Sequence, residues 1–225
     1  MSTFPHPALV LEAFATRVRA CRICLEAPLK TPLPHEPRPV LRVSTTAKLL
    51  VASQAPGTKV HATGISFNDA SGDRLRQWMD VSRETFYDTA QVAIVPMGFC
   101  FPGQDAKKAD LPPRPECRAA WHDDLFALMP QIETILAIGR YAQDYHFARA
   151  GRPLPKKITL DEIIRNWRDF AGQAPRIIPL PHPSWRNIGW AKRNPWFEAE
   201  ILPMLKQVVA QTLGTSSLGT SSLGA

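Results

Sequence analysis

Four short apolar runs constrain the fold of this chain more than any other feature of its sequence. They lie at residues 48–53, 91–95, 134–138 and 176–179, and most are bounded by proline, glycine or polar residues, as buried strands are. Stretches with helical spacing of apolar residues separate them. Because strands that alternate with helices form parallel sheets covered on both faces, the sequence predicts an α/β fold with a parallel sheet of about four strands.

The helical stretches are defined by the spacing of apolar residues and by capping signals. The spacing predicts helices at 8–19, 71–79, 116–129, 140–148 and 159–170. Thr159 followed by Glu162 is a capping-box pattern for the last of these. A final helix is predicted to begin at Asn194 and Pro195, as an N-cap followed by proline at the first helical position, and to run to about Leu213.

Length and charge narrow the class of protein. At 225 residues the chain is short for two domains, so we expect one domain at 1–212 and a flexible tail at 213–225, where LGTSS occurs twice. Lys and Arg number 27 against 20 Asp and Glu, a formal charge of +7. Such an excess favours a polyanionic partner, although a merely basic protein has the same composition.

The sequence predicts a cytoplasmic protein that does not use a membrane as its partner. No apolar run reaches the roughly 20 residues that cross a bilayer. The N-terminus lacks the basic region and apolar core of a signal peptide. In a reducing compartment, four cysteines are better interpreted as ligands or buried thiols than as disulfides.

A polar loop at residues 53–73 follows the first predicted strand. It begins with a Pro-Gly turn and carries a second glycine, the aromatic Phe67 and two carboxylates, of which Asp69 is the first. In open α/β sheets, ligands bind beyond the carboxyl ends of the strands. The loop is therefore predicted to line a ligand site.

The four cysteines form a second group. Cys21 and Cys24 are a CxxC pair after the first helix, and Cys100 and Cys117 flank a proline-rich loop. Thiolates on three segments can hold an iron–sulfur cluster, and zinc uses the same ligands. The cysteines can also be simple buried thiols, so the spacing alone leaves three interpretations open.

A third group follows the last predicted strand. His182 lies between two prolines on a loop, which is a poor position for a core residue. Ser184, Trp185 and Arg186 follow it; arginine suits phosphate contact and tryptophan suits a wedge between bases. A lone histidine is more often structural, and these neighbours shift the balance toward function.

Taken in order, these motifs resemble those of the uracil-DNA glycosylase superfamily, most of all its iron–sulfur branches, over residues 8–210. The resemblance rests on Gln54-Ala55-Pro56-Gly57 after the first strand, Gly64 with Phe67, the run 69–73, the cysteine spacing, and His182-Pro183-Ser184. It implies a three-layer αβα fold with a central four-stranded parallel sheet. It also implies a structural 4Fe-4S cluster on Cys21, Cys24, Cys100 and Cys117, and favours it over zinc.

The resemblance also implies an activity: a monofunctional glycosylase that flips uracil out of DNA and hydrolyses its N-glycosidic bond, leaving an abasic site. His182 would stabilise the negative charge that develops on uracil O2, with backbone N–H groups around Gln54. Phe67 would stack on the flipped base. The best-known branch has an acid where this chain has Ala55, so Asp69 is predicted to orient the water.

Two further departures from the family pattern concern the base. Gly57 replaces the tyrosine that excludes the thymine methyl group, so a bulkier base is not obviously refused. The asparagine that reads the uracil edge is absent near Pro96, so backbone groups of Met97 and Gly98 are predicted to read it. Uracil is the first expectation, with other deaminated bases open.

A competing function is a DNA-lesion binding protein that binds or traps uracil or abasic DNA without turnover. The trapping branch carries a nucleophilic histidine between the third and fourth cysteines. Residues 101–116 contain lysines and no histidine, which counts against trapping. In either case we expect a monomer that contacts DNA through Ser184, Trp185 and Arg186.

Overall fold

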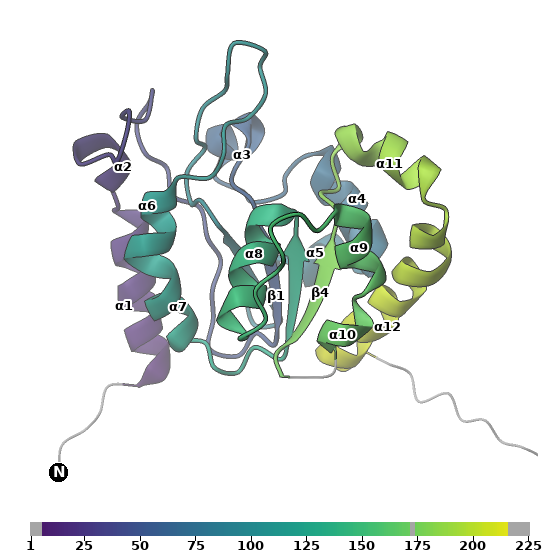
Figure 1. The fold of residues 1–225 in the computed structure, drawn as a ribbon. Coiled ribbons are helices and arrows are strands. Elements are labelled where there is room, and N and C mark those ends of the chain that lie inside the picture. The colour runs from purple at the N-terminus through teal and green to yellow at the C-terminus, as the bar shows by residue number, and fades with distance from the viewer. Residues whose placement is uncertain (1–5, 172–173, 216–225) are drawn as a thin grey trace, which may run out of the picture.

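A four-stranded parallel sheet forms the centre of the computed structural model, which describes residues 6–171 and 174–215 (Figure 1). The strand order is β2-β1-β3-β4, and all neighbouring strands are parallel. The strands are β1 (Leu49–Ser53), β2 (Val92–Pro96), β3 (Thr134–Ile138) and β4 (Arg176–Leu180). Each lies within one residue of an apolar run, which confirms the predicted α/β fold.

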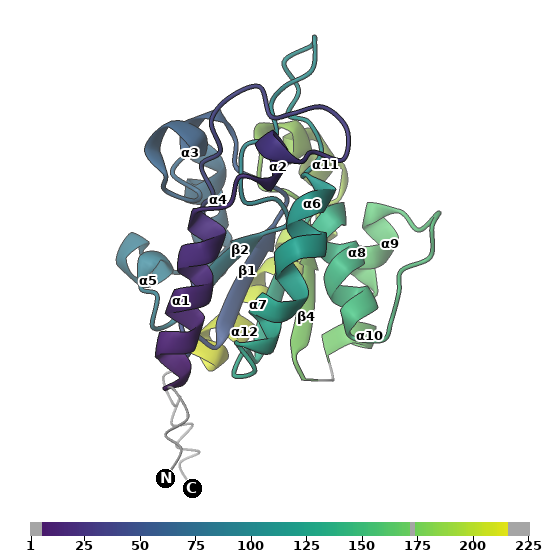
Figure 2. The same cartoon turned by 90° about the vertical axis from the view of Figure 1, so that its left-hand side faces the viewer.

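Helices cover both faces of the sheet, giving the three layers that the resemblance implied. On one side lie α1 and α7, and on the other α12 (Figures 1 and 2). The α-helices of the described residues are α1 (Pro7–Arg19), α2 (Ile23–Glu26), α3 (Thr58–Thr63), α4 (Ala70–Met79), α5 (Arg83–Tyr87), α6 (Pro115–Cys117), α7 (Asp123–Ala127), α8 (Arg140–Arg149), α9 (Leu160–Arg165), α10 (Arg168–Ala171), α11 (Ile188–Arg193) and α12 (Leu202–Leu213). Two π-helical turns lie at Arg118–His122 and Phe197–Ile201, and one 3-10 turn lies at Trp185–Asn187.

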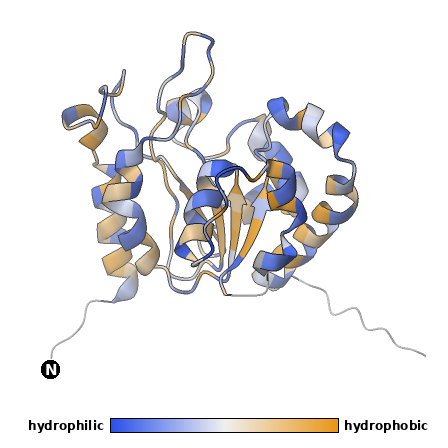
Figure 3. Cartoon of the chain, viewed as in Figure 1, coloured by the Kyte–Doolittle hydropathy of each residue, from blue (hydrophilic) through white to orange (hydrophobic). Residues whose placement is uncertain are grey.

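The sheet has two apolar faces because successive side chains of a strand point in opposite directions. Leu50 and Ala52 of β1 belong to the core cluster that includes residues of α1, α7 and α8. Leu49 and Val51 belong to the cluster that includes residues of α4 and α12. Every residue of β1 is buried, as expected for a parallel strand covered on both sides. Figure 3 shows apolar residues concentrated along the strands.

Several helix predictions are confirmed, with differences at their ends. The capping box of Thr159 and Glu162 is present, but the helix it begins ends at Arg165 and a separate α10 follows. The predicted helix at 116–129 contains a π-helical turn between α6 and α7. Asn194 does not cap a following helix through its side chain, because its carboxamide donates to Trp190 O and accepts from the Trp196 indole.

Four short helices of the described residues were not predicted. They are α2, α3, α5 and α11, and none buries more than one residue. With so little apolar periodicity, they give no helical signal in the sequence. Helix α3 matters for function, because it lies inside the loop at 53–73 and ends at Gly64 in the left-handed conformation.

The C-terminal boundary falls at the end of α12. Leu213 is its last residue and Gly214 caps it in the left-handed conformation. Of the tail predicted at 213–225, residues 216–225 lie outside the described residues. Among the helices that the structure describes, none has the length and hydropathy of a bilayer span.

A buried histidine in α8 predicts acid sensitivity. His146 is 1% exposed, and within the described residues neither ring nitrogen has a hydrogen-bond partner. Burial, reinforced by His122 and Arg149, lowers its pKa to about 3. The unfolded chain binds this proton below a pH of about 6.5 and the folded chain does not, so the free energy of unfolding falls as pH drops.

We expect His146→Phe to flatten this dependence by one proton, about 1.4 kcal/mol per pH unit between pH 6 and 4. Urea unfolding of both proteins at several pH values measures the slope. The free energy of unfolding of the variant will still depend on pH, because burial also lowers the pKa of His122. An unchanged slope would show that His146 takes up its proton in the folded state.

Candidate active site

A cleft of about 480 Å³ lies beyond the carboxyl ends of β1 and β4. Five segments line it: the loop after β1, the start of α4, the C-terminal part of β2 with Ile94 and Pro96, the loop at 102–111 and the segment after β4. In an open α/β sheet this edge is the expected place for a ligand. The predicted loop at 53–73 therefore does line a cavity, together with segments far away in the sequence.

The loop after β1 forms one wall. Gln54, Ala55, Pro56 and Gly57 all line the cleft. The carbonyl of Gln54 accepts a hydrogen bond of 2.9 Å from the backbone of residue 98, which ties the loop to the end of β2. The loop is thereby held as an extension of the sheet until α3 begins.

Met97 and Gly98 are not among the described residues that line the cleft. Their N–H groups donate to Ser53 O at 2.8 Å and to Gln54 O at 2.9 Å. A Cβ at Gly98 would lie 3.0 Å from the Cβ of Pro113, so this backbone packs behind the wall. Both N–H groups are thus already bonded, and the prediction that backbone groups of Met97 and Gly98 read the base stays a prediction.

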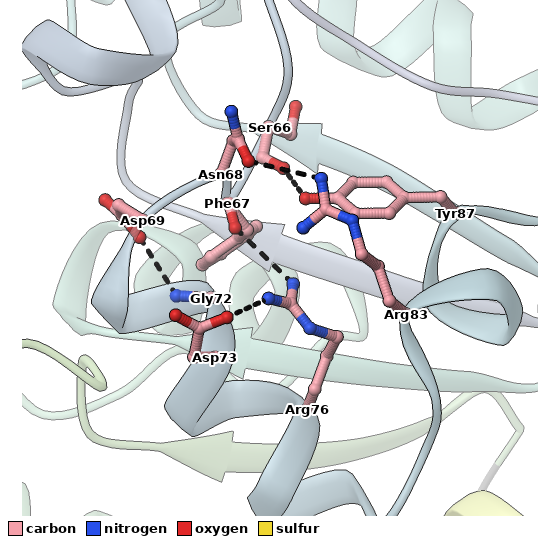
Figure 4. A network of polar contacts seen from close by, with 9 residues as sticks. All are labelled: Ser66, Phe67, Asn68, Asp69, Gly72, Asp73, Arg76, Arg83 and Tyr87. Atoms are coloured by element: carbon pink, nitrogen blue, oxygen red, sulfur yellow. Dashed lines mark hydrogen bonds and ion pairs between the residues drawn. The ribbon is translucent and has the colours of Figure 1, made fainter.

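Phe67 lies in the cleft wall in a constrained conformation. It has a φ of +55° and is 8% exposed. Its carbonyl accepts from Arg76, and its ring meets Phe86 edge-on at 5.9 Å. Figure 4 shows the polar contacts that hold residues 66–69 in place: Tyr87 to Ser66 O, Arg83 to Asn68, Arg76 to Phe67 O, and Gly72 N to Asp69.

Asp69 caps α4 and also lines the cleft. Its Oδ1 accepts a 2.9 Å hydrogen bond from Gly72 N, as an N-cap carboxylate does. Asp73, one turn later, instead pairs with Arg76. The structure thus separates the two acids of this run, and only Asp69 belongs to the lining of the main cleft.

His182 lines the cleft from the segment after β4. Burial lowers its pKa, while the carboxylates of Asp69 and Asp110 oppose that shift. The imidazole is therefore neutral at pH 7 and can donate one N–H. Asn187 donates to His182 O at 2.8 Å, which fixes the turn that carries the ring.

The three residues after Pro183 lie at the rim of the cleft. Ser184, Trp185 and Arg186 all line it. Trp185 is 73% exposed, and the Arg186 guanidinium lies 5.6 Å from its ring centroid. Arg74 donates to Pro183 O at 3.1 Å, which joins this segment to α4. An exposed ring beside a cation suits contact with a polyanion.

Sequence reasoning missed the contribution of the loop at 102–111. Gln104, Lys108 and Asp110 line the cleft, and Asp110 Oδ2 lies 3.7 Å from where a Cβ of Gly57 would be. The sequence indicated a proline-rich loop between Cys100 and Cys117, but it could not show which residue of this loop lines the site. That depends on the pairing of Gln104 with Asp110.

These residues fall within a match to a known family. The model of the uracil DNA glycosylase superfamily matches residues 42–206. The chain belongs to this superfamily. Membership indicates glycosidic-bond hydrolysis as the type of reaction and DNA as the partner. The match includes Asp69, Asp110 and His182 but begins after Cys21 and Cys24, so it does not bear on a cluster.

Pairwise interactions link the four cysteines of this superfamily member. Cys24 and Cys117 are hydrogen bonded, and Cys100 interacts electrostatically with Cys21 and Cys24. The bond with Cys117 lowers the pKa of Cys24 to about 7, and burial raises that of Cys100 to about 12. The part of the chain that the structure describes holds no group of three or more His, Cys, Asp or Glu arranged to hold a metal ion.

The contact of α4 with Phe67 can be tested at Gly72. A Cβ there would lie 1.8 Å from Phe67 O, so Gly72→Ala must displace the loop and should destabilise the protein by about 1–3 kcal/mol. Gly189→Ala is the matched control, because the nearest atom to its Cβ is Arg193 Nη1 at 3.5 Å. In a helix that change should be neutral or stabilising. Urea unfolding measures the free energy of unfolding of each variant, and equal values for the two variants would contradict this packing.

Proposed function

We propose that this superfamily member is a monofunctional uracil-DNA glycosylase, which flips uracil out of DNA and hydrolyses its glycosidic bond to leave an abasic site. One observation carries the proposal: an aromatic ring, a carboxylate and a neutral imidazole, from Phe67, Asp69 and His182, line a single cleft. Each answers one requirement of the reaction.

The departing base needs a hydrogen-bond donor. As the bond to C1′ breaks, its electron pair passes to the base and negative charge collects on O2. His182 donates an N–H to O2. A neutral imidazole carries one N–H, so it can donate without a prior change of protonation state. Burial, which lowers the pKa of His182, keeps it in this form at pH 7.

The sugar needs a water and a compensating negative charge. Asp69 is fixed by its hydrogen bond with Gly72 N, which leaves the other carboxylate oxygen for water. The carboxylate orients the water toward C1′ and takes its proton as the new C–O bond forms. The N-cap hydrogen bond thus also fixes the orientation of the general base, Asp69.

The flipped base needs a platform and room. Phe67 lines the cleft, and a π face binds any base that leaves the stack. The cleft has a volume of about 480 Å³, and Gly57 adds no side chain to it, but Asp110 Oδ2 lies 3.7 Å from where a Cβ at position 57 would be. Uracil is the primary substrate of the proposal, and other deaminated bases are secondary ones.

The DNA itself would pass across the rim. Trp185 offers an exposed ring for the gap that the flipped base leaves, and Arg186 offers a phosphate contact. Ser184 stands between these residues and His182. A +7 charge on the whole chain favours the same partner.

A 4Fe-4S cluster on Cys21, Cys24, Cys100 and Cys117 is part of the proposal. The mutual interactions of the four thiols support it, as does the Trp121 indole, which donates to Cys21 Sγ at 3.3 Å. N–H···S bonds of this kind accompany cluster thiolates. The cluster would join three segments and supply no step of the hydrolysis.

An alkaline cleavage assay tests the function. The protein is incubated with a labelled oligonucleotide containing one uracil, heated in alkali, and run on a denaturing gel. Cleaved strands support turnover. A band of protein attached to DNA would favour the lesion-trapping alternative, and intact, unshifted DNA would exclude uracil as a substrate.

The same assay tests the roles of the two site residues. Asp69→Asn and His182→Ala should each lower the single-turnover rate by about 10²-fold or more. Asp80→Asn is a matched control, because Asp80 ends α4 in the left-handed conformation that asparagine also accepts. If Asp69→Asn cleaves as fast as Asp80→Asn, the water is activated elsewhere.

The cluster has a test that does not depend on activity. Protein purified without oxygen should be brown, absorb visible light and contain about four iron atoms, as the cluster stoichiometry requires. Cys24→Ser should lose both colour and iron. Colourless protein that contains zinc would assign the four thiols to the competing metal.

A further inference from the structure

A small hairpin brings an additional acid to the cleft. Residues 103–111, here called the hairpin 103–111, form the teal loop that rises above α3 in Figure 1. Gln104 and Asp110 pair in antiparallel fashion, and Asp105 Oδ1 accepts from the N–H groups of Lys107 and Ala109 at 2.8 and 2.9 Å. The hairpin is thus ordered by its own hydrogen bonds.

Asp110 has a fixed orientation within this hairpin. Its Oδ1 accepts from Gln104 Nε2 at 2.9 Å. Its Oδ2 is directed toward the β1 loop, 3.7 Å from the Cβ position of Gly57. A side chain at position 57 would compete for this space, so glycine there leaves room for the carboxylate.

Two carboxylates therefore act on the same imidazole. Asp69 from α4 and Asp110 from the hairpin 103–111 both interact electrostatically with His182. They come from different segments that line the cleft. His182 thus shares the cleft with two acids rather than one.

An acid at this point has an electrostatic cost in a DNA-binding protein. Asp110 is exposed at the mouth of a cleft whose ligand carries a phosphate on every nucleotide, and like charges repel. A carboxylate held here by a dedicated hydrogen bond needs a positive partner. The cation-like deoxyribose of the transition state is such a partner.

We propose that Asp110 is a second catalytic carboxylate, which acts on the deoxyribose together with Asp69 and replaces the acid that the β1 loop lacks at Ala55. This inference rests on the glycosylase function proposed above. It assigns chemistry to a residue that no motif in the sequence singled out.

The two acids divide one hydrolytic step. The bond from C1′ to the base breaks and its electrons leave with the base, whose O2 accepts from His182. Water oxygen then bonds to C1′ and one water proton passes to Asp69, which afterwards gives it up through solvent to the base anion and is again a carboxylate. Asp110 stays ionised and offsets the positive charge of the sugar, so it neither gains nor loses a proton. The products are the free base and an abasic sugar.

Asp110→Asn tests this role against Asp105→Asn. Both variants replace an acid of the hairpin 103–111, and asparagine retains the Oδ1 acceptor in each. Asp105 is not among the described residues that line the cleft. Single-turnover rates on uracil-containing DNA should fall about 10²-fold for Asp110→Asn and stay within about twofold of wild type for Asp105→Asn.

Binding separates catalysis from structure. Removal of a negative charge that faces DNA should leave the affinity of Asp110→Asn for abasic-site DNA unchanged or higher, measured by fluorescence anisotropy. Weakened binding with the loss of rate would show a structural role and overturn the proposal. A rate equal to that of Asp105→Asn would overturn it too.

Two controls complete the design. The Tm of each variant confirms folding, and Asp110→Ala repeats the test without an amide in the cleft; it should lose rate to the same extent. If the wild-type protein releases no uracil, the proposed function itself fails and the inference falls with it. If the wild-type protein releases uracil and the Asp110 variants release it equally fast, the proposed function stands and the inference is wrong.

Discussion

The position of β1 at the centre of the sheet determines where chemistry can occur. In the order β2-β1-β3-β4, the chain leaves β1 toward one edge and leaves β3 toward the other. The connections accordingly cover opposite faces, with α4 packed in one apolar cluster and α8 in the other. A crevice opens where such a sheet reverses its strand order, beyond the carboxyl ends. The active-site loop follows β1 into that crevice.

Electrostatics then decides what the crevice can do. A chain with a charge of +7 favours DNA as a partner, yet two carboxylates and a neutral histidine line the cleft. Burial lowers the pKa of His182, and its acidic neighbours offset only part of that effect. In the proposed reaction, the carboxylates would offset positive charge on the sugar and the uncharged donor would serve the departing base. That separation is what breaking a glycosidic bond requires.

The sequence was sufficient for the sheet and for half of the site. Buried parallel strands are continuous apolar runs, so β1 and β3 were located to within a residue. Asp69 and Phe67 could be found because they are local in sequence to β1. The hydrogen bonds of Met97 and Gly98 could not be predicted, since whether an N–H is free depends on its partner across the sheet.

Asp110 shows why sequence patterns could not predict the rest of the site. Its place in the cleft follows from a pairing with Gln104 and from the absence of a side chain at Gly57. Position 57 lacks the bulky ring and position 55 the acid that mark the best-known branch. In the proposed mechanism these two differences are linked, because the Asp110 carboxylate of the hairpin 103–111 lies beside the space at Gly57 and would supply the charge that Ala55 lacks.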